Sequence, residues 1–311
     1  MKQKIATIFG ASGFIGRHLI RRLTEKDFRI IVATRSPYLH GSLKTLGNPG
    51  QIDLEKINIF DEEKLRILIK NSHIVINLIG ILYETKKQSF NSIHVKFPEL
   101  LSSLCHKSNV EKLIHISAIG AKKNTNSKYL KTKFDGEECI VNNFKKSTII
   151  RPSVVFGDED KFFNKFASLS EIFPALPLIG GGNTKFQPIY VGDVAKSIVS
   201  ILEKEKIDQN IYEIGGPQIY TFKELIEILL KVIKKKRFLI SIPFSVAKYQ
   251  AKVFELFPKP LLTTDQVEML KYDNIITGNC PTLKELGIVP KNMEDIIPNY
   301  LYRFRKGGQF G

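Results

Sequence analysis

The fold is decided by the stretch Ile5-Ala6-Thr7-Ile8-Phe9-Gly10-Ala11-Ser12-Gly13-Phe14-Ile15-Gly16 near the amino end. It predicts a strand, a tight glycine turn and the first turn of a helix. Gly10 permits the sharp turn, Gly13 lets the backbone approach a pyrophosphate, and Gly16 lets the helix pack closely on the strand. Free N–H groups and the positive dipole end at the helix N-terminus favour phosphate binding. The alternative is a glycine-rich loop without a ligand, but the flanking strand and helix favour a dinucleotide site.

Short apolar runs alternate with helical patterns from Lys4 to about Arg151, and this alternation predicts βαβ units on a parallel sheet. We expect the strands at Ile5–Phe9, Ile30–Thr34, Lys56–Ile59 (the weakest), Ile74–Leu78, Leu113–Ile116 and Thr148–Arg151. The predicted fold class is α/β, a Rossmann-type doubly wound parallel sheet with a smaller C-terminal α/β lobe.

The length of 311 residues allows one large core and a second, smaller lobe. We expect an NADP(H)-binding Rossmann domain over 1–157, to which elements from 186–215 return. Residues 158–311 form a smaller, mostly helical lobe for a substrate or a partner. Thr221 with Glu224, and Thr263 with Gln266, have the spacing of capping boxes and predict helices that begin at Phe222 and Thr264.

The chain is strongly basic, with a formal net charge of +16, which would favour acidic partners or anionic lipid headgroups. Only Lys234 to Arg237 form a compact basic run, and no aromatic-interleaved ribbon accompanies it, so nucleic acid is an unlikely partner. The three cysteines lack paired spacing and the histidines lack metal-ligand spacing, so we expect no metal and a reducing compartment. We therefore predict a cytoplasmic protein, at most peripheral on the inner face of the plasma membrane.

The residues after the second strand indicate the cofactor. In an NAD-selective site that strand ends in an acidic residue, which binds the ribose 2′-hydroxyl. Here it ends in Arg35-Ser36. A guanidinium can hydrogen-bond a 2′-phosphate with two N–H groups, so the sequence favours NADP(H) over NAD(H).

The spacing of GASGFIG, VINLIG (Val75–Gly80), HIS (His115–Ser117), Tyr129 with Lys133, and RPSVVFG (Arg151–Gly157) resembles the extended and atypical short-chain dehydrogenases, an NAD-dependent epimerase/dehydratase-like family. The likeness covers the whole chain. More narrowly, VINLIGILYE, KLIHISAIGA, RPSVVFGDEDKFFNKFA, QPIYVGDVAKSI and LLTTDQVEML resemble the family of dehydrogenase-like accessory subunits of respiratory complex I (NADH:ubiquinone oxidoreductase) and their bacterial homologues.

The resemblance implies a set of site residues. Asn58 and Ile59 would line the adenine, Leu78 to Gly80 the ribose side, and Pro152 to Val154 the nicotinamide end. The full expected cofactor set is Gly10, Ser12, Gly13, Phe14, Ile15, Gly16, Arg35, Ser36, Asn58, Ile59, Leu78, Ile79, Gly80, Ile116, Lys133, Pro152, Ser153 and Val154.

Tyr129 and Lys133 are the candidate catalytic pair. One helical turn apart, they share a face, so the ammonium could lower the phenol pKa from about 10 towards neutrality and hold the nicotinamide ribose. The family places a Ser or Thr at the end of the fifth strand to polarise a substrate carbonyl, and here that position is Ala118. Ser117 is next to it, but neighbouring strand residues point to opposite faces.

Three functions fit these observations. The resemblance, Arg35 and Ala118 favour an accessory or assembly component of respiratory complex I that binds NADP(H) with weak or no turnover. The retained Tyr129 and Lys133 favour an active NADP-dependent reductase or epimerase on a small carbonyl or nucleotide-sugar substrate. The basic run leaves an RNA-binding protein on a dehydrogenase scaffold as the third.

Overall fold

The computed structural model describes residues 3–204 and 210–308, and its centre is a seven-stranded parallel sheet. The strand order is β3-β2-β1-β4-β5-β6-β11. Their bounds are β1 Ile5–Phe9, β2 Arg29–Thr34, β3 Ile52–Lys56, β4 Ile74–Asn77, β5 Lys112–Ile116, β6 Ser147–Pro152 and β11 Ile211–Ile214. The order reverses between β1 and β4, which is where doubly wound sheets bind ligands at the carboxyl ends of their strands. The predicted fold class is confirmed.

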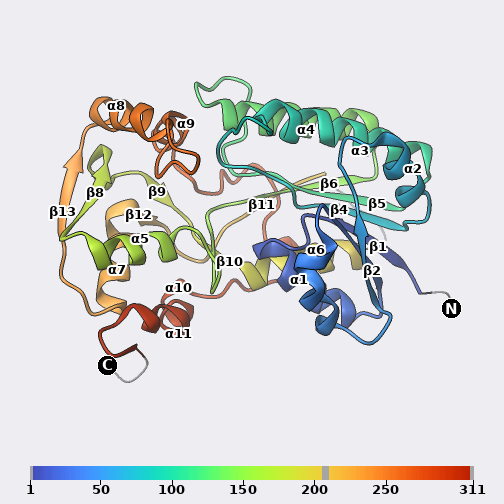
Figure 1. The fold of residues 1–311 in the computed structure, drawn as a ribbon, viewed down its shortest axis with the longest axis horizontal. Helices are drawn as coiled ribbons and strands as arrows, with labels where there is room; N and C mark the ends of the chain where they lie inside the picture. Colours follow the sequence, from blue (N-terminus) through green and yellow to red (C-terminus); the bar gives the residue numbers. More distant parts are fainter. Residues whose placement is uncertain (1–2, 205–209, 309–311) are drawn as a thin grey trace.

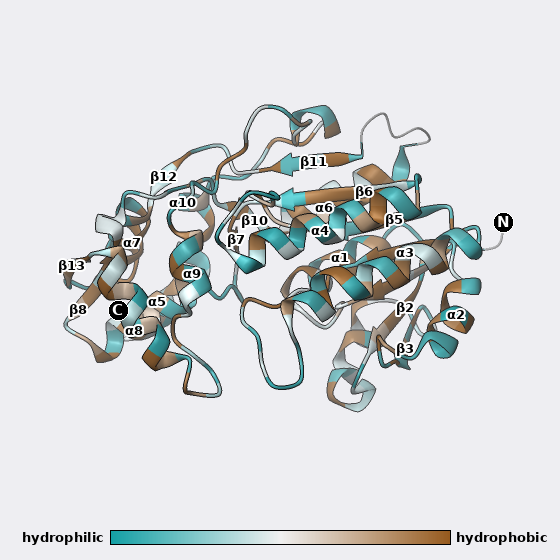
Figure 2. Ribbon diagram, turned by 90° about the horizontal axis from the view of Figure 1, so that it is seen from above, coloured by the Kyte–Doolittle hydropathy of each residue, from teal (hydrophilic) through white to brown (hydrophobic). Residues whose placement is uncertain are grey.

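Helices cover both faces of this sheet (Figure 1). On one face lie α1 (Phe14–Thr24) and α6 (Val191–Glu203), and on the other α2 (Glu62–Lys70), α3 (Phe97–Lys107) and α4 (Lys128–Asn143). Both helical layers bury apolar side chains against alternate residues of the strands, as their amphipathic patterns predict. Figure 2 shows the result as helices that carry both hydrophobic and hydrophilic residues around an apolar sheet.

The remaining elements form the smaller lobe around a second apolar core, to which α5 and α7 contribute. The lobe contains α5 (Phe163–Ile172), β8 (Ala175–Ile179), β9 (Lys185–Phe186), β12 (Tyr220–Thr221), α7 (Phe222–Val232), β13 (Phe238–Ile242), α8 (Phe244–Phe254), α9 (Thr264–Met269), α10 (Met293–Ile296) and α11 (Pro298–Leu301). Two short paired strands, β7 (Val155–Phe156) and β10 (Ile189–Tyr190), lie between the sheet and the lobe. The chain therefore returns to the main sheet through α6 and β11.

Local sequence signals place most element ends correctly. The capping boxes of Thr221 and Thr263 are formed, and they begin α7 and α9 at the predicted residues. The weak third strand is the exception, because β3 ends where it was predicted to begin. Asp53 and Glu55 interrupt its apolar pattern, whereas Ile57 to Asp61 form the turn into α2, which Asp61 caps through the Lys64 amide at 3.2 Å.

Candidate functional site

The glycine turn after β1 has the geometry of a phosphate cradle. Gly10 adopts φ +79°, and a Cβ on it would lie 3.1 Å from the carbonyl carbon of Leu78. The Gly13 amide donates to the Gly10 carbonyl at 3.0 Å and closes the turn. No side chain caps α1 and its first turn holds no acid, so the opening amides of this helix are available to a pyrophosphate. A dinucleotide fits this cradle.

Two of the predicted segments meet at this turn. A Cβ on Gly10 would also lie 3.2 Å from Ile79, so the loop after β4 lies directly against the loop after β1. Leu78 continues the parallel pairing by donating its amide to the Phe9 carbonyl at 2.9 Å. The structure therefore brings the expected pyrophosphate and ribose segments together.

The segments expected on the adenosine side lie at the ends of β2 and β3. Thr34 is in register with Lys56, so Arg35 and Ser36 follow β2 beside the turn that holds Asn58 and Ile59. The Arg35 guanidinium is exposed and forms no hydrogen bond or ion pair with any described residue. It is thus available to an anionic ligand.

Lys133 is buried at the opposite end of this site. Its ammonium donates to the Ile116 carbonyl at 3.1 Å, and a Cβ on Gly80 would lie 3.2 Å from its Nζ. Burial lowers the pKa of Lys133 to about 8, against a smaller opposing effect of the Glu137 carboxylate. The structure thus assembles Gly80, Ile116 and Lys133 as the sequence predicts, and the ammonium can donate to a ribose hydroxyl.

Tyr129 differs from its expected role. Its pKa is raised rather than lowered, first because the phenol is buried and second because the Asp265 carboxylate is near. The Lys133 ammonium lies 6.0 Å from the centroid of the tyrosine ring, too far to offset these effects. In this arrangement of side chains the pKa of the phenol is thus shifted opposite to the expected direction, and the catalytic role of Tyr129 stays a prediction.

Apolar side chains surround the tyrosine. Phe90 and Leu130 form a buried cluster with it, against which Ala118 packs from the end of β5, and two residues of the smaller lobe complete it, Met269 and Tyr272. Ala118 therefore adds a methyl group to this cluster at the position where the resemblance implies a hydroxyl. Ser117 is buried on the side of Glu137, as the alternation of strand residues predicts.

The smaller lobe also holds the helix that carries Tyr129 and Lys133. Asp265, at the start of α9, accepts hydrogen bonds from the Lys128 amide at 2.6 Å and the Tyr129 amide at 3.2 Å. It thereby satisfies free amides at the N-terminus of α4 and complements the helix dipole. Sequence reasoning missed this residue, because no local signal identifies a partner 136 residues away.

A second contact from the smaller lobe fixes the segment Pro152–Val154. The Asn274 side-chain oxygen accepts from the Ser153 hydroxyl at 2.7 Å and from the Val154 amide at 2.8 Å. The expected nicotinamide end of the site is thus positioned by a residue 121 positions later in the chain. The sequence offers no signal for it.

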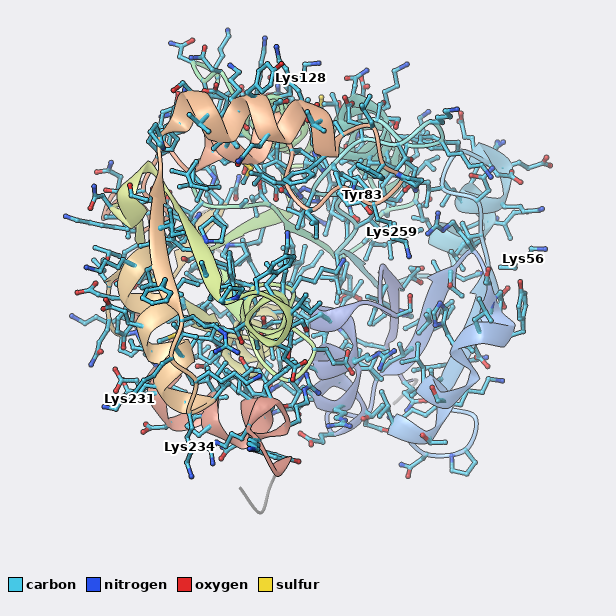
Figure 3. The ribbon with its side chains drawn as sticks, turned by 60° about the vertical axis from the view of Figure 1, so that its left-hand side comes forward. Lys56, Tyr83, Lys128, Lys231, Lys234 and Lys259 are labelled. Carbon is cyan, nitrogen blue, oxygen red and sulfur yellow. The ribbon has the colours of Figure 1, made fainter. Side chains whose placement is uncertain are left out.

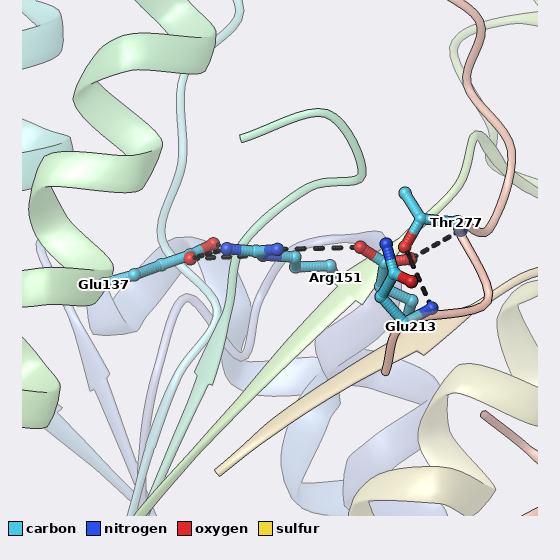
Figure 4. Close-up of polar contacts among 5 residues, drawn as sticks. Glu137, Arg151, Glu213 and Thr277 are labelled. Carbon is cyan, nitrogen blue, oxygen red and sulfur yellow. Dashed lines mark hydrogen bonds and ion pairs between the residues drawn. The ribbon is translucent and has the colours of Figure 1, made fainter. Parts of the chain in front are cut away.

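A buried ion-pair network connects α4 to β6 and β11 (Figure 4). The Arg151 guanidinium lies 2.5 Å from one carboxylate oxygen of Glu137 and 3.5 Å from Glu213. Glu213 in turn accepts from the amide and the hydroxyl of Thr277, each at 2.7 Å. The network therefore joins the helix of the candidate site to the C-terminal segment.

A groove of about 890 Å³ opens between the two lobes, and Lys128 and Asp265 are among the residues that line it. Phe90 and the loop around Tyr83 line one side, and the α8–α9 loop, including Leu256 and Phe257, lines the other. Figure 3 labels Tyr83 on the first of these loops and Lys259 on the second. This groove is large enough for a small organic molecule.

Two features are absent from the described residues, 3–204 and 210–308. No helix among them is long and apolar enough to span a bilayer. No group of three or more His, Cys, Asp or Glu side chains among them could hold a metal ion.

Sequence comparison places these features in a known context. The model of the NAD dependent epimerase/dehydratase family matches residues 6–215. The mitochondrial NADH dehydrogenase (ubiquinone) 1 alpha subcomplex subunit 9 of Arabidopsis thaliana is 33% identical over 98% of this chain and 79% of that protein. The protein of the same name from Mus musculus is 32% identical, over 93% of this chain and 78% of its own length.

Solved structures share the fold at low sequence identity. The dTDP-glucose 4,6-dehydratase of Streptomyces venezuelae has a TM-score of 0.76 at 17% identity and covers 97% of this chain and 98% of its own. The UDP-glucose 4-epimerase of Thermotoga maritima has a TM-score of 0.70 at 19% identity, over 97% of this chain and 99% of its own. These structures share the fold, and the match of the family model over residues 6–215 shows that the chain belongs to the NAD-dependent epimerase/dehydratase family.

Proposed function

We propose that the protein holds NADP(H) in the glycine-turn site and acts as an accessory or assembly component of respiratory complex I, with weak or no turnover. The observation that carries this proposal is the near-full-length similarity to complex I subunits, at 33% identity in one case. The enclosed, unactivated Tyr129 supports the low turnover, because a general acid needs a pKa near the working pH and access to a substrate.

The preference for NADP(H) is supported by Arg35, which is exposed and unpaired among the described residues. Arg17 gives no such support, because its guanidinium pairs with Glu159 at 2.9 Å on the surface. A 2′-phosphate bound by a free guanidinium gains charge-assisted hydrogen bonds that a 2′-hydroxyl does not.

Reversing the charge at Arg35 tests this preference. Arg35→Asp is expected to weaken NADPH binding about 30-fold, a loss of about 2 kcal/mol, with NADH affinity unchanged or improved. Calorimetric titration with both coenzymes measures it. Arg66→Asp on the exposed side of α2 changes the net charge equally and should leave both affinities unchanged. Equal losses of NADPH affinity in the two variants would show that Arg35 does not bind the coenzyme.

The partner surface that we propose is the outward face of α8. Ala247 and Ala251 are buried, yet the opposite side of the helix and the loop after it are also apolar. Tyr249 and Leu256 are 74% and 83% exposed, and Lys252 and Lys259 flank them. Exposed apolar residues so grouped indicate a binding surface, and the lysines suit an acidic rim on the partner.

Affinity purification tests the proposed role. Tagged protein isolated in mild detergent from its own cells is expected to bring down complex I subunits, identified by mass spectrometry. The double variant Tyr249→Asp, Leu256→Asp should lose them, whereas Ile67→Asp, at an exposed position on α2, should not. Wild-type protein that never carries complex I subunits contradicts the proposal. Binding to anionic vesicles instead would assign the α8 face to a membrane surface.

The second candidate is an active NADP-dependent reductase or epimerase. The observations in its favour are the retained Tyr129 and Lys133 and a groove of about 890 Å³, which Lys128 lines at the start of the same helix. Turnover of a small carbonyl or nucleotide-sugar substrate that is abolished by Tyr129→Phe would favour it, because that change removes the proton donor alone.

A further inference from the structure

The structure contains a buried histidine between the loop after β4 and the helix α4. His94 lies in the π-helical turn Asn91–Lys96, which runs directly into α3, and it is 1% exposed. Single π-helical turns occur frequently at functional sites. The site described above leaves His94 without a role, although a Cβ on Gly80 would lie 3.9 Å from its Nε2.

The two ring nitrogens of His94 connect two different elements. Nε2 accepts the Ile81 amide at 3.2 Å, and Nδ1 lies 3.2 Å from the Thr132 hydroxyl on α4. Because the amide can only donate, Nε2 is the unprotonated nitrogen and Nδ1 carries the proton. Nδ1 therefore donates to Thr132, whose own hydroxyl donates to the Lys128 carbonyl at 2.8 Å.

This hydrogen-bond chain has one consistent direction from the loop to the helix. The imidazole remains neutral, because burial and the nearby Lys133 ammonium lower the pKa of His94 to about 2. Phe90 stacks on the ring at 5.3 Å between centroids, and Tyr129 meets it edge-on at 5.3 Å. His94 thus has one orientation and one tautomer, so its ring can hold the loop after β4 and the helix α4 at a fixed separation.

The backbone of His94 also lies at a fixed, short distance from α4. A Cβ on Gly136 would lie 1.8 Å from the His94 carbonyl oxygen, so the glycine allows the two segments to cross closely. The side chain then spans from α4 to the loop, and Gly80 of that loop lies beside the Lys133 ammonium. Displacing the imidazole would change the separation between Gly80 and Lys133.

We propose that His94 is a positioning residue for the dinucleotide, which sets the distance between the ribose-side loop Leu78–Ile81 and the ribose-binding Lys133 through one hydrogen bond to each element. This inference rests on the proposed binding of NADP(H). In this role His94 acts through the loop and the helix, by its hydrogen bonds to Ile81 and Thr132.

Fluorescence titration with NADPH tests the role of His94. His94→Leu keeps an apolar side chain in the pocket but leaves the Ile81 amide unbonded, and we expect about tenfold weaker binding. The emission of the bound nicotinamide at saturation should also change, because the ribose is held differently. His94→Gln, whose side-chain oxygen can reach the Ile81 amide, should bind within about threefold of wild type.

A second histidine offers a matched control. His73 Nδ1 accepts the Ile5 amide at 3.1 Å, the same kind of bond, but at the amino end of β1 away from the glycine turn. His73→Leu should lower thermal stability and leave NADPH affinity unchanged. If His94→Leu does not fold, His94→Asn, which is too short for the Ile81 amide, is compared with His94→Gln and should bind more weakly.

The outcomes separate this inference from the proposed function. Wild-type protein that binds no NADPH overturns both. If the wild type binds NADPH and His94→Leu binds it with the same affinity, the positioning role alone is overturned. The same holds if His94→Asn and His94→Gln bind NADPH equally well. Equal weakening by His94→Leu and His73→Leu also overturns it, because the loss would then reflect general stability.

Discussion

Replacing Gly16 with alanine is expected to lower the free energy of unfolding by about 3 kcal/mol and to abolish dinucleotide binding. A Cβ at this position would lie 2.3 Å from the Ala11 carbonyl oxygen and 2.4 Å from its Cα. These are backbone atoms of the glycine turn itself, so they cannot move aside as a side chain would. The first turn of α1 must instead shift away from β1, and the cradle opens.

Chemical denaturation and NADPH titration of the same preparations measure both effects. Gly41→Ala is the control, because a Cβ there would meet no atom within 4 Å. It should retain the stability and the affinity of the wild type. A stable Gly16→Ala variant with full affinity would show that α1 does not pack on the glycine turn as described.

Replacing Arg151 with methionine is expected to have the second large effect. It should lower the free energy of unfolding by about 3 to 5 kcal/mol. The side chains of Arg151, Glu137 and Glu213 are only 13%, 2% and 3% exposed. Removing the guanidinium leaves two buried carboxylates without their shared partner (Figure 4). Arg17→Met is the control, because the Arg17–Glu159 pair is 44% and 49% exposed, and it should cost less than about 1 kcal/mol.

The pH dependence of the Arg151→Met variant gives a further check. Burial raises the pKa of Glu137 even beside Arg151, and without the guanidinium the pKa rises further. The folded variant then binds more protons than the unfolded chain, so its stability should fall as pH rises from about 5 to 8. Urea unfolding at several pH values measures this dependence. If the difference in free energy of unfolding between variant and wild type does not change with pH, the buried network is contradicted.

The central sheet could be predicted from the sequence because its signals are local. Glycines at fixed spacing, short buried strands rich in aliphatic residues and the capping boxes of Thr221 and Thr263 each depend on a few neighbouring residues. The edge strand β3 was predicted a few residues late, because Asp53 and Glu55 weaken its pattern. An edge strand is paired with a neighbour on one side only, and the partly exposed polar residues of β3 make it resemble a loop.

The candidate site could be predicted only in part. Lys133, Gly80 and Gly10 follow from motif spacing, and the structure assembles them with the expected neighbours. The residues that enclose and hold the site, Asp265, Asn274 and Met269, come from the smaller lobe and interact across more than a hundred positions. The sequence shows that Tyr129 has a helical partner in Lys133, but the pKa of the phenol depends on burial that only the folded chain reveals.

Isothermal titration calorimetry of the purified chain with NADPH and with NADH tests the central claim most directly. The glycine cradle and the free Arg35 predict heat with NADPH and a dissociation constant below that for NADH. No heat with either coenzyme, or tighter binding of NADH, would contradict the account.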